Sequence, residues 1–216
     1  MEQKNAVVFG ATGLVGSELI MQLIADKRYA GIKVFGRRDT GIINKKLVSR
    51  IVDVSDVKTY SSEIVGDELY ICLGTTIKKA GSIQAMEHAD RDLPAEIARE
   101  ARENGINSVA VVSSIGADSG SRNYYLRIKG EMETEIAGNG FGRTVIVRPS
   151  MLLGKRKEFR FGEEAGKAVM KALRLLFVGR MRKYRGIEAS DVAAAMIRLL
   201  NTSPKPDRIV FESDEL

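Results

Sequence analysis

Cysteine, histidine and tryptophan are almost missing from this chain of 216 residues, which has one, one and none of them respectively. With Cys72 alone, no disulfide can form within the chain, and with His88 alone no zinc site of cysteines and histidines can be assembled. We therefore expect no metal site. The scarcity of cysteine is typical of a protein kept in a reducing compartment, which leads us to expect a cytoplasmic location.

Long apolar runs and proline-rich linkers are also missing. The first apolar run, residues 6–9, is too short for the core of a signal peptide. No run approaches the roughly 20 residues that a helix needs to cross a bilayer, so we expect no transmembrane segment. With only four prolines and 44% hydrophobic residues, the chain predicts one domain over residues 1–216, with residues from about 150 to 207 as a small C-terminal region.

Short apolar segments alternate with longer segments of helical period along most of the chain. Strands are predicted at residues 6–9, 32–35, 47–52, 68–73, 108–112, 144–147 and 208–211. Helices are predicted at residues 14–25, 82–103 with a kink or break at Pro94, 124–137 and 190–197. This alternation is typical of an α/β protein, and we expect a doubly wound, mainly parallel Rossmann sheet with helices on both faces.

A glycine-rich turn with the spacing G-x-x-G-x-x-G connects the first strand to the first helix. In such a turn, Gly10 permits the tight bend, Gly13 lets backbone N–H groups approach a pyrophosphate, and Gly16 lets helix and strand pack closely. The positive end of the helix dipole also faces the phosphates. A purely structural turn can have the same glycines, but the strand, turn and helix context favours a dinucleotide site made by Gly10, Thr12, Gly13, Leu14, Val15 and Gly16.

Two arginines, Arg37 and Arg38, stand at the end of the second strand, where an NAD-binding protein has an acidic residue. Guanidinium groups bind phosphate with charge-assisted hydrogen bonds, so the pair predicts NADP(H) held by its adenosine 2′-phosphate. The alternative is a solvated arginine pair. Farther along the cofactor we expect Asp53 near the adenine amino group, and the central riboses beside Leu73, Gly74 and Thr75, although either segment is also compatible with an ordinary turn.

A tyrosine and a lysine four residues apart, Tyr125 and Lys129, share one face of the helix predicted at residues 124–137. A phenol with a pKa near 10 is a poor proton donor at neutral pH, and a nearby ammonium, helped by an oxidised nicotinamide ring, favours its ionisation. Tyr125 is therefore a candidate acid and base toward a carbonyl or alcohol oxygen that Ser114 would hold. The alternative is a chance spacing on a helix surface. We also expect Ser113 to contact the cofactor.

The sequence resembles the extended and atypical short-chain dehydrogenase/reductases over nearly the whole chain to about residue 160. The matching segments are the glycine turn and residues 36–38, 52–53, 72–76, 90–92, 113–114, 116–117, 125–131 and 148–149. The resemblance implies that Tyr125 is the general acid and base, that Lys129 assists it and binds the nicotinamide ribose, and that Ser114 orients the substrate. It also implies contacts to the nicotinamide end of the cofactor from Leu152 and Arg160. The asparagine of the proton relay in many of these reductases is not identifiable.

Residues 155–185 carry eleven basic and three acidic side chains, an excess larger than the +6 net charge of the whole chain. The segment follows the sixth strand and should cover the substrate side, so an anionic substrate such as an acyl-CoA or a phosphate ester fits it. A helix lying on an acidic membrane or protein partner fits it too, as does a core-packed helix with a solvated charged face. We expect no nucleic acid binding, because no recognition motif accompanies the charge.

Together these patterns predict an NADP(H)-dependent oxidoreductase that transfers hydride to or from a small carbonyl or alcohol substrate. The intact spacing of Tyr125 and Lys129 favours this enzyme. The alternative is a non-catalytic NADPH-binding sensor or regulatory protein of the same fold, which the short C-terminal region leaves open.

Overall fold

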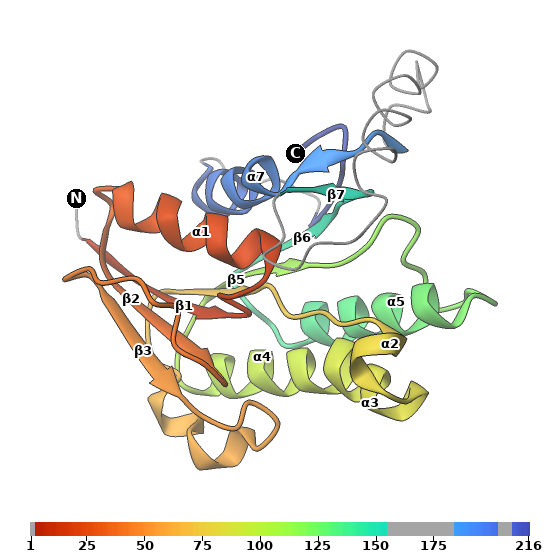
Figure 1. The fold of residues 1–216 in the computed structure, drawn as a ribbon, viewed down its shortest axis with the longest axis horizontal. Helices are drawn as coiled ribbons and strands as arrows, with labels where there is room; N and C mark the ends of the chain where they lie inside the picture. The colour runs from red at the N-terminus through yellow and green to blue at the C-terminus, as the bar shows by residue number, and fades with distance from the viewer. Residues whose placement is uncertain (1–2, 155–183, 203–208) are drawn as a thin grey trace.

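The computed structural model describes residues 3–154, 184–202 and 209–216. Its centre is a sheet of seven strands in the order β3-β2-β1-β4-β5-β6-β9, and every neighbouring pair is parallel (Figure 1). The strands are β1 (Lys4–Phe9), β2 (Tyr29–Gly36), β3 (Leu47–Ile51), β4 (Glu68–Ile71), β5 (Ser108–Val112), β6 (Arg143–Arg148) and β9 (Val210–Glu212). The strand order reverses between β1 and β4, and open α/β sheets bind ligands at the carboxyl ends of strands beside such a switch point.

Helices cover both faces of this sheet (Figure 1). One face is covered by α1 (Leu14–Ala25) and α7 (Ala189–Asn201), whose apolar side chains form one core with the strand residues beneath them. The other face is covered by α4 (Leu93–Glu103), α5 (Tyr124–Gly138) and two short 3-10 turns, Val57–Thr59 and Ser61–Glu63, which form a second core. The fold is therefore the three-layer α/β Rossmann arrangement that the sequence predicts.

The central strands are buried on both sides, which explains their nearly continuous apolar sequences. Successive residues of β1 alternate between the two cores: Val8 lies in the core beneath α1 and α7, and Phe9 lies in the core beneath α4 and α5. The Phe9 ring stacks on Phe35 of β2 with 5.1 Å between ring centroids, and Phe35 stacks on Tyr60 at 5.3 Å. These contacts fix the carboxyl ends of β1 and β2, where the glycine turn and the arginine pair begin.

The helix predicted at residues 82–103 is interrupted. It consists of α3 (Ile83–Glu87), a π-helical turn (His88–Asp92) and α4, with a separate short helix, α2 (Ile77–Ala80), before it. The expected break at Pro94 is therefore wrong in position, because Pro94 lies in the first turn of α4, where its missing N–H leaves no hydrogen bond unmade. The irregular turn comes just before it and buries Asp90.

A buried polar network closes the amino end of the sheet, opposite to the glycine turn. The Glu68 carboxylate accepts hydrogen bonds from Tyr29 at 2.6 Å and Tyr70 at 2.7 Å, and it pairs with the Lys4 ammonium at 2.6 Å. Asn201, the last residue of α7, donates to the Tyr29 hydroxyl. Because its buried polar groups satisfy one another, this network joins three strands and α7 without offering a free group for chemistry.

Candidate active site

The glycine turn forms a backbone cradle at the start of α1. Gly10 has a φ of +84°, and a Cβ at this position would collide with the carbonyl oxygen of Cys72. A Cβ on Gly16 would collide with the carbonyl oxygen of Gly10, so α1 can approach β1 this closely only without a side chain there. Gly13 is the N-cap and supplies no side-chain hydrogen bond to the helix. The first N–H groups of α1 have no partner within the helix, which is the arrangement found where helix N-termini bind anions.

The remaining predicted residues of this turn contribute in different ways. Thr12 is exposed and Leu14 half-buried, so both border the cradle. The Val15 side chain lies in the core beneath α1, and only its backbone N–H is placed to face a ligand.

The two arginines follow β2 at its carboxyl end, and both are exposed. Within the described part of the chain, neither Arg37 nor Arg38 has a hydrogen bond or ion pair. Asp53 lies near Arg37, and the hydroxyl of Ser55 donates to its carboxylate at 2.6 Å. Ser55, and to a smaller degree the Arg37 charge, hold the pKa of Asp53 below its usual value. Two unpaired guanidinium groups thus stand beside the cradle.

The segment after β4 passes above a buried carboxylate. The backbone N–H of Thr75 donates to Asp90 Oδ2 at 3.2 Å, and a Cβ on Gly74 would lie 3.5 Å from Asp90 Oδ1. Leu73 packs against the core beneath α4 and α5. The predicted residues 73–75 therefore lie at the carboxyl edge of the sheet, and they rest on a residue of the π-helical turn.

Lys129 of α5 is buried and pairs with this same carboxylate. Its Nζ lies 2.7 Å from Asp90 Oδ1, and the side chains are 3% and 1% exposed. Tyr125, one turn earlier on α5, is 37% exposed, and its hydroxyl has no hydrogen bond within the described residues. The structure thus places Tyr125 and Lys129 on the same helix, but the lysine ammonium binds Asp90, and no hydrogen bond joins the lysine to the tyrosine.

The neighbouring tyrosine has a different environment. The Tyr124 hydroxyl donates to Glu87 at 2.9 Å, and the Arg127 guanidinium lies 5.3 Å from the centre of its ring. Burial and the hydrogen bond to Glu87 raise the pKa of Tyr124. Its phenol is therefore engaged, whereas that of Tyr125 is open to a ligand.

The two serines after β5 also differ. Ser113 is 6% exposed, and its hydroxyl has no hydrogen-bond partner among the described residues. Ser114 is half-buried, and its hydroxyl makes only a long 3.4 Å hydrogen bond to the carbonyl of Ile115. The loop that follows rests on α5 at Gly130, where a Cβ would collide with the backbone of Asp118 and Ser119. Both hydroxyls therefore remain available at the carboxyl edge of β5.

The predicted residues beyond β6 are only partly described. Leu152 is half-buried and belongs to β7 (Leu152–Leu153), which pairs with β8 (Ile187–Glu188) as a small parallel sheet. Arg160 lies outside the described residues, as does the basic segment 155–185 except for its last two residues.

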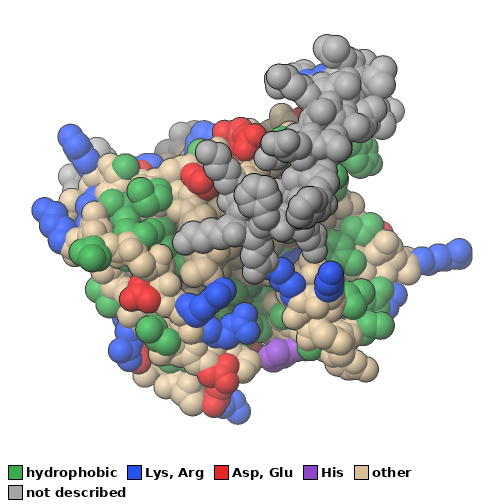
Figure 2. Space-filling view, in the orientation of Figure 1, with side chains coloured by type: hydrophobic (Ala, Val, Ile, Leu, Met, Phe, Trp, Pro, Cys, Tyr) green, Lys and Arg blue, Asp and Glu red, His purple; other side chains and the backbone are tan. Residues whose placement is uncertain are grey.

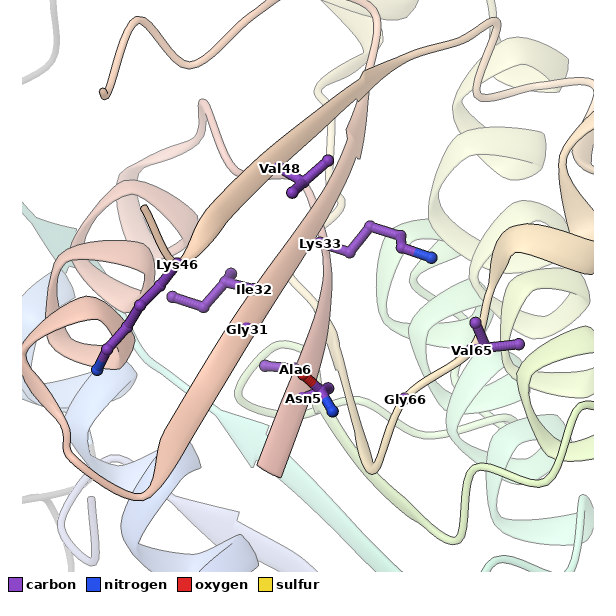
Figure 3. Close-up of a pocket in the computed structure, with 9 residues that line it drawn as sticks. All are labelled: Asn5, Ala6, Gly31, Ile32, Lys33, Lys46, Val48, Val65 and Gly66. Atoms are coloured by element: carbon purple, nitrogen blue, oxygen red, sulfur yellow. The ribbon is translucent and has the colours of Figure 1, made fainter. Parts of the chain in front are cut away.

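The described surface has a hollow bordered by basic side chains and a separate open groove. Figure 2 shows Lys and Arg side chains, in blue, on both sides of a hollow in the middle of one face of the molecule. A separate open groove of about 380 Å³ lies at the amino ends of β1, β2 and β3, away from the glycine turn (Figure 3). Its two lysines already bind backbone carbonyls, Lys33 that of Glu63 and Lys46 those of Ile24 and Asp26. This groove lies at the end of the sheet opposite to the glycine turn.

Asp90 is the site residue that sequence reasoning did not assign. The signal was present, because Asp90 falls on the apolar stripe formed by Met86, Leu93 and Ile97 at helical spacing. A carboxylate on a buried stripe needs a partner, and the partner is Lys129.

Comparison with known proteins identifies the family of this chain. The sequence pattern of the NAD(P)H-binding family matches residues 10–203. Protein FMP52 of Candida albicans, named as mitochondrial, is 35% identical over 71% of this chain and 69% of its own length. Protein HTATIP2 of Rattus norvegicus is 30% identical over 76% of this chain and 69% of its own length.

These relatives contradict the expected cytoplasmic location, because FMP52 proteins from several fungi are named as mitochondrial. The scarcity of cysteine excludes a disulfide framework but does not select one compartment. Within the described residues, no helix is both long and apolar enough to cross a membrane.

Solved structures have the same fold. UDP-glucose 4-epimerase from Thermotoga maritima aligns with a TM-score of 0.70 at 15% identity, over 98% of this chain and 79% of its own. A short-chain dehydrogenase/reductase from Veillonella parvula aligns with a TM-score of 0.64 at 12% identity, over 95% and 89% of the two chains. Together with the glycine cradle and the sequence matches, this likeness shows that the chain belongs to the NAD(P)H-binding family of atypical short-chain dehydrogenase/reductase-like Rossmann proteins.

Proposed function

We propose that this protein is an NADP(H)-dependent oxidoreductase that interconverts a small carbonyl compound and its alcohol. The observation that carries the proposal is the placement of Tyr125 and Lys129 on α5: an open phenol and, one turn later, a buried ammonium. Both stand on the helix that borders the carboxyl edge of the sheet, where the glycine cradle lies. A surface helix has no need to bury a lysine, so this arrangement favours a reaction site over a chance spacing.

The residues present fit the cofactor. The glycines at 10, 13 and 16 let the turn and the start of α1 pack closely against β1 and Cys72, and the first turn of α1 would hold the cofactor diphosphate with backbone N–H groups. The guanidinium groups of Arg37 and Arg38, which have no partner among the described residues, would hold an adenosine 2′-phosphate, which selects NADP(H) over NAD(H). When bound, the nicotinamide supplies or accepts the hydride.

The side chains of this chain would move the proton. In the reducing direction, hydride adds to the carbonyl carbon and the Tyr125 hydroxyl donates its proton to the carbonyl oxygen, so an alcohol forms and a phenolate remains. The positive charge of Lys129 stabilises that phenolate through space. The Ser114 hydroxyl would donate a hydrogen bond to the same oxygen and fix its position. Water then returns the proton to Tyr125.

We propose that the carbonyl compound binds at the carboxyl ends of β5 and β6, close to Tyr125 and Ser114. The basic excess of residues 155–185 favours a substrate that carries a negative charge.

The test is NADPH oxidation against a panel of neutral and anionic carbonyl compounds with wild type, Tyr125→Phe and Tyr124→Phe. Tyr124→Phe is the matched control, because it removes the neighbouring hydroxyl, which binds Glu87. We expect Tyr125→Phe to lower kcat at least a hundredfold and Tyr124→Phe to retain most of it. Tight NADPH binding without turnover of any compound by wild type would refute the enzyme and favour a cofactor sensor.

A further inference from the structure

We propose that Asp90 is a positioning residue that aims the Lys129 ammonium at the vicinal hydroxyls of the nicotinamide ribose. This inference rests on the proposed cofactor site and extends it to a residue of the π-helical turn. The two groups meet at 2.7 Å, and both side chains are almost fully buried. A buried ammonium is stable only beside a counter-charge, and Asp90 is its one ion-pair partner in the described part of the chain.

Asp90 is itself held in place. The backbone N–H of Thr75 donates to Oδ2, which leaves Oδ1 for the lysine. The carboxylate thereby joins the segment after β4 to α5, two elements that border the predicted cofactor path from opposite sides. The π-helical turn that contains Asp90 also interrupts an otherwise regular helix, and such turns occur frequently at functional sites.

The geometry leaves donors free for a ligand. An ammonium has three N–H donors, and the 2.7 Å ion pair with Asp90 Oδ1 engages no more than one of them. No hydrogen bond from the Lys129 ammonium is found among the described residues, so at least two donors remain. Two neighbouring hydroxyl groups of a ribose are a matching pair of acceptors. Asp90 would act through Lys129, by limiting the directions in which its two free N–H groups point.

The experiment compares binding of the whole cofactor with binding of its adenosine half. Asp90→Asn keeps the shape of the side chain and removes its charge, and Asp92→Asn is the matched control in the same turn, where the carboxylate pairs with Arg91 at the surface. Calorimetry measures the affinity of each variant for NADPH and for adenosine 2′,5′-bisphosphate, which lacks the nicotinamide ribose. We expect Asp90→Asn to bind NADPH about tenfold more weakly, the bisphosphate unchanged, and Asp92→Asn to match wild type for both ligands.

A second variant shows whether Asp90 acts through the lysine. Lys129→Met and the double variant Asp90→Asn/Lys129→Met should bind NADPH with equal affinity, because Asp90 has nothing left to position. The double variant leaves no unpaired buried charge. Its NADPH affinity, compared with that of Lys129→Met, therefore tests the inference even if Asp90→Asn alone does not fold. Equal losses for both ligands, an unchanged NADPH affinity in Asp90→Asn, or a further loss in the double variant would each overturn the inference. If the affinities are as expected but no carbonyl compound is turned over, the proposed oxidoreductase activity is refuted and the role of Asp90 in cofactor binding stands.

Discussion

Glu133 of α5 and Arg148 at the end of β6 form a bidentate ion pair. Arg148 Nε donates to Glu133 Oε1 at 2.9 Å, and its Nη2 donates to Oε2 at 2.5 Å. The hydrogen bonds that Arg148 donates to Glu133 raise the pKa of Arg148, so the guanidinium stays charged. Glu133 is one turn beyond Lys129 on α5. This pair therefore fastens the helix that carries the candidate catalytic residues to the carboxyl edge of the sheet.

Removing the charge of Glu133 should destabilise the protein. The two side chains are 7% and 21% exposed, so Glu133→Gln leaves a mostly buried guanidinium with a weaker partner. We expect the free energy of unfolding to fall by about 2 to 3 kcal/mol. Glu135→Gln, at an exposed position on the same helix, should change it by less than about 0.5 kcal/mol. Urea unfolding of the three proteins measures both values, and equal stability of the two variants would contradict the structural role of the pair.

The choice between NADP and NAD should depend on the arginine pair. Arg37→Ala removes one of two unpaired guanidinium groups, so we expect the affinity for NADP to fall at least about tenfold and the affinity for NAD to stay the same. Arg99→Ala, which removes an exposed arginine on α4, is the control and should alter neither. Fluorescence titration with both cofactors gives the four affinities. A wild-type protein that binds NADP and NAD equally well would remove the basis for this assignment.

The glycine cradle should tolerate no side chain at Gly16. Gly16→Ala places a methyl group against the carbonyl oxygen of Gly10 and forces α1 away from β1, so cofactor affinity should fall at least about tenfold and stability by about 1 to 3 kcal/mol. Gly138→Ala, at the last residue of α5 with open space around it, should instead stabilise the protein by up to about 1 kcal/mol. Thermal unfolding and cofactor titration test both. Tight binding by Gly16→Ala would show that the diphosphate lies elsewhere.

The Cys72 thiol should make the stability depend on alkaline pH. Burial raises the pKa of this thiol to about 12. In the unfolded chain the pKa is about 8.5. Between these values the unfolded state loses a proton that the folded state keeps, so stability falls as the pH rises, by about 1.36 kcal/mol per unit.

Cys72→Ala isolates this contribution, because all other titrating groups remain the same. The difference in unfolding free energy between wild type and Cys72→Ala should be constant below pH 8 and should shrink by about 2 kcal/mol at pH 10. A difference that does not change with pH would show that solvent reaches the folded thiol.

Local sequence determined the elements of this fold. The glycine turn was readable because all three glycines act within one strand, turn and helix, and α1 begins and ends at the predicted residues. The central strands β1, β4, β5 and β6 could be predicted because both of their faces are buried, which makes each one a short apolar run. The parallel order follows from the alternation of strands and helices and the right-handed hand of their crossovers.

The position of the helix interruption was harder to predict from the sequence. Proline is the usual reason to expect a break, yet Pro94 sits where a helix can begin, and the π-helical turn before it has no such local marker. That turn depends on burying Asp90 against α5, a contact that no local pattern contains.

The tertiary structure alone decided which side chains of the candidate site contact one another. The spacing of Tyr125 and Lys129 placed both on one helix face, but only packing decided that the lysine ammonium turns inward to Asp90 while the phenol stays open. Likewise, Ser113 and Ser114 are equivalent in sequence, and only the fold decided that the Ser113 hydroxyl is buried without a hydrogen-bond partner among the described residues. The physical reason is the same in each case. Helix and strand periodicity is set by neighbours along the chain, whereas the partner of a buried charge is set by whichever distant segment the core brings against it.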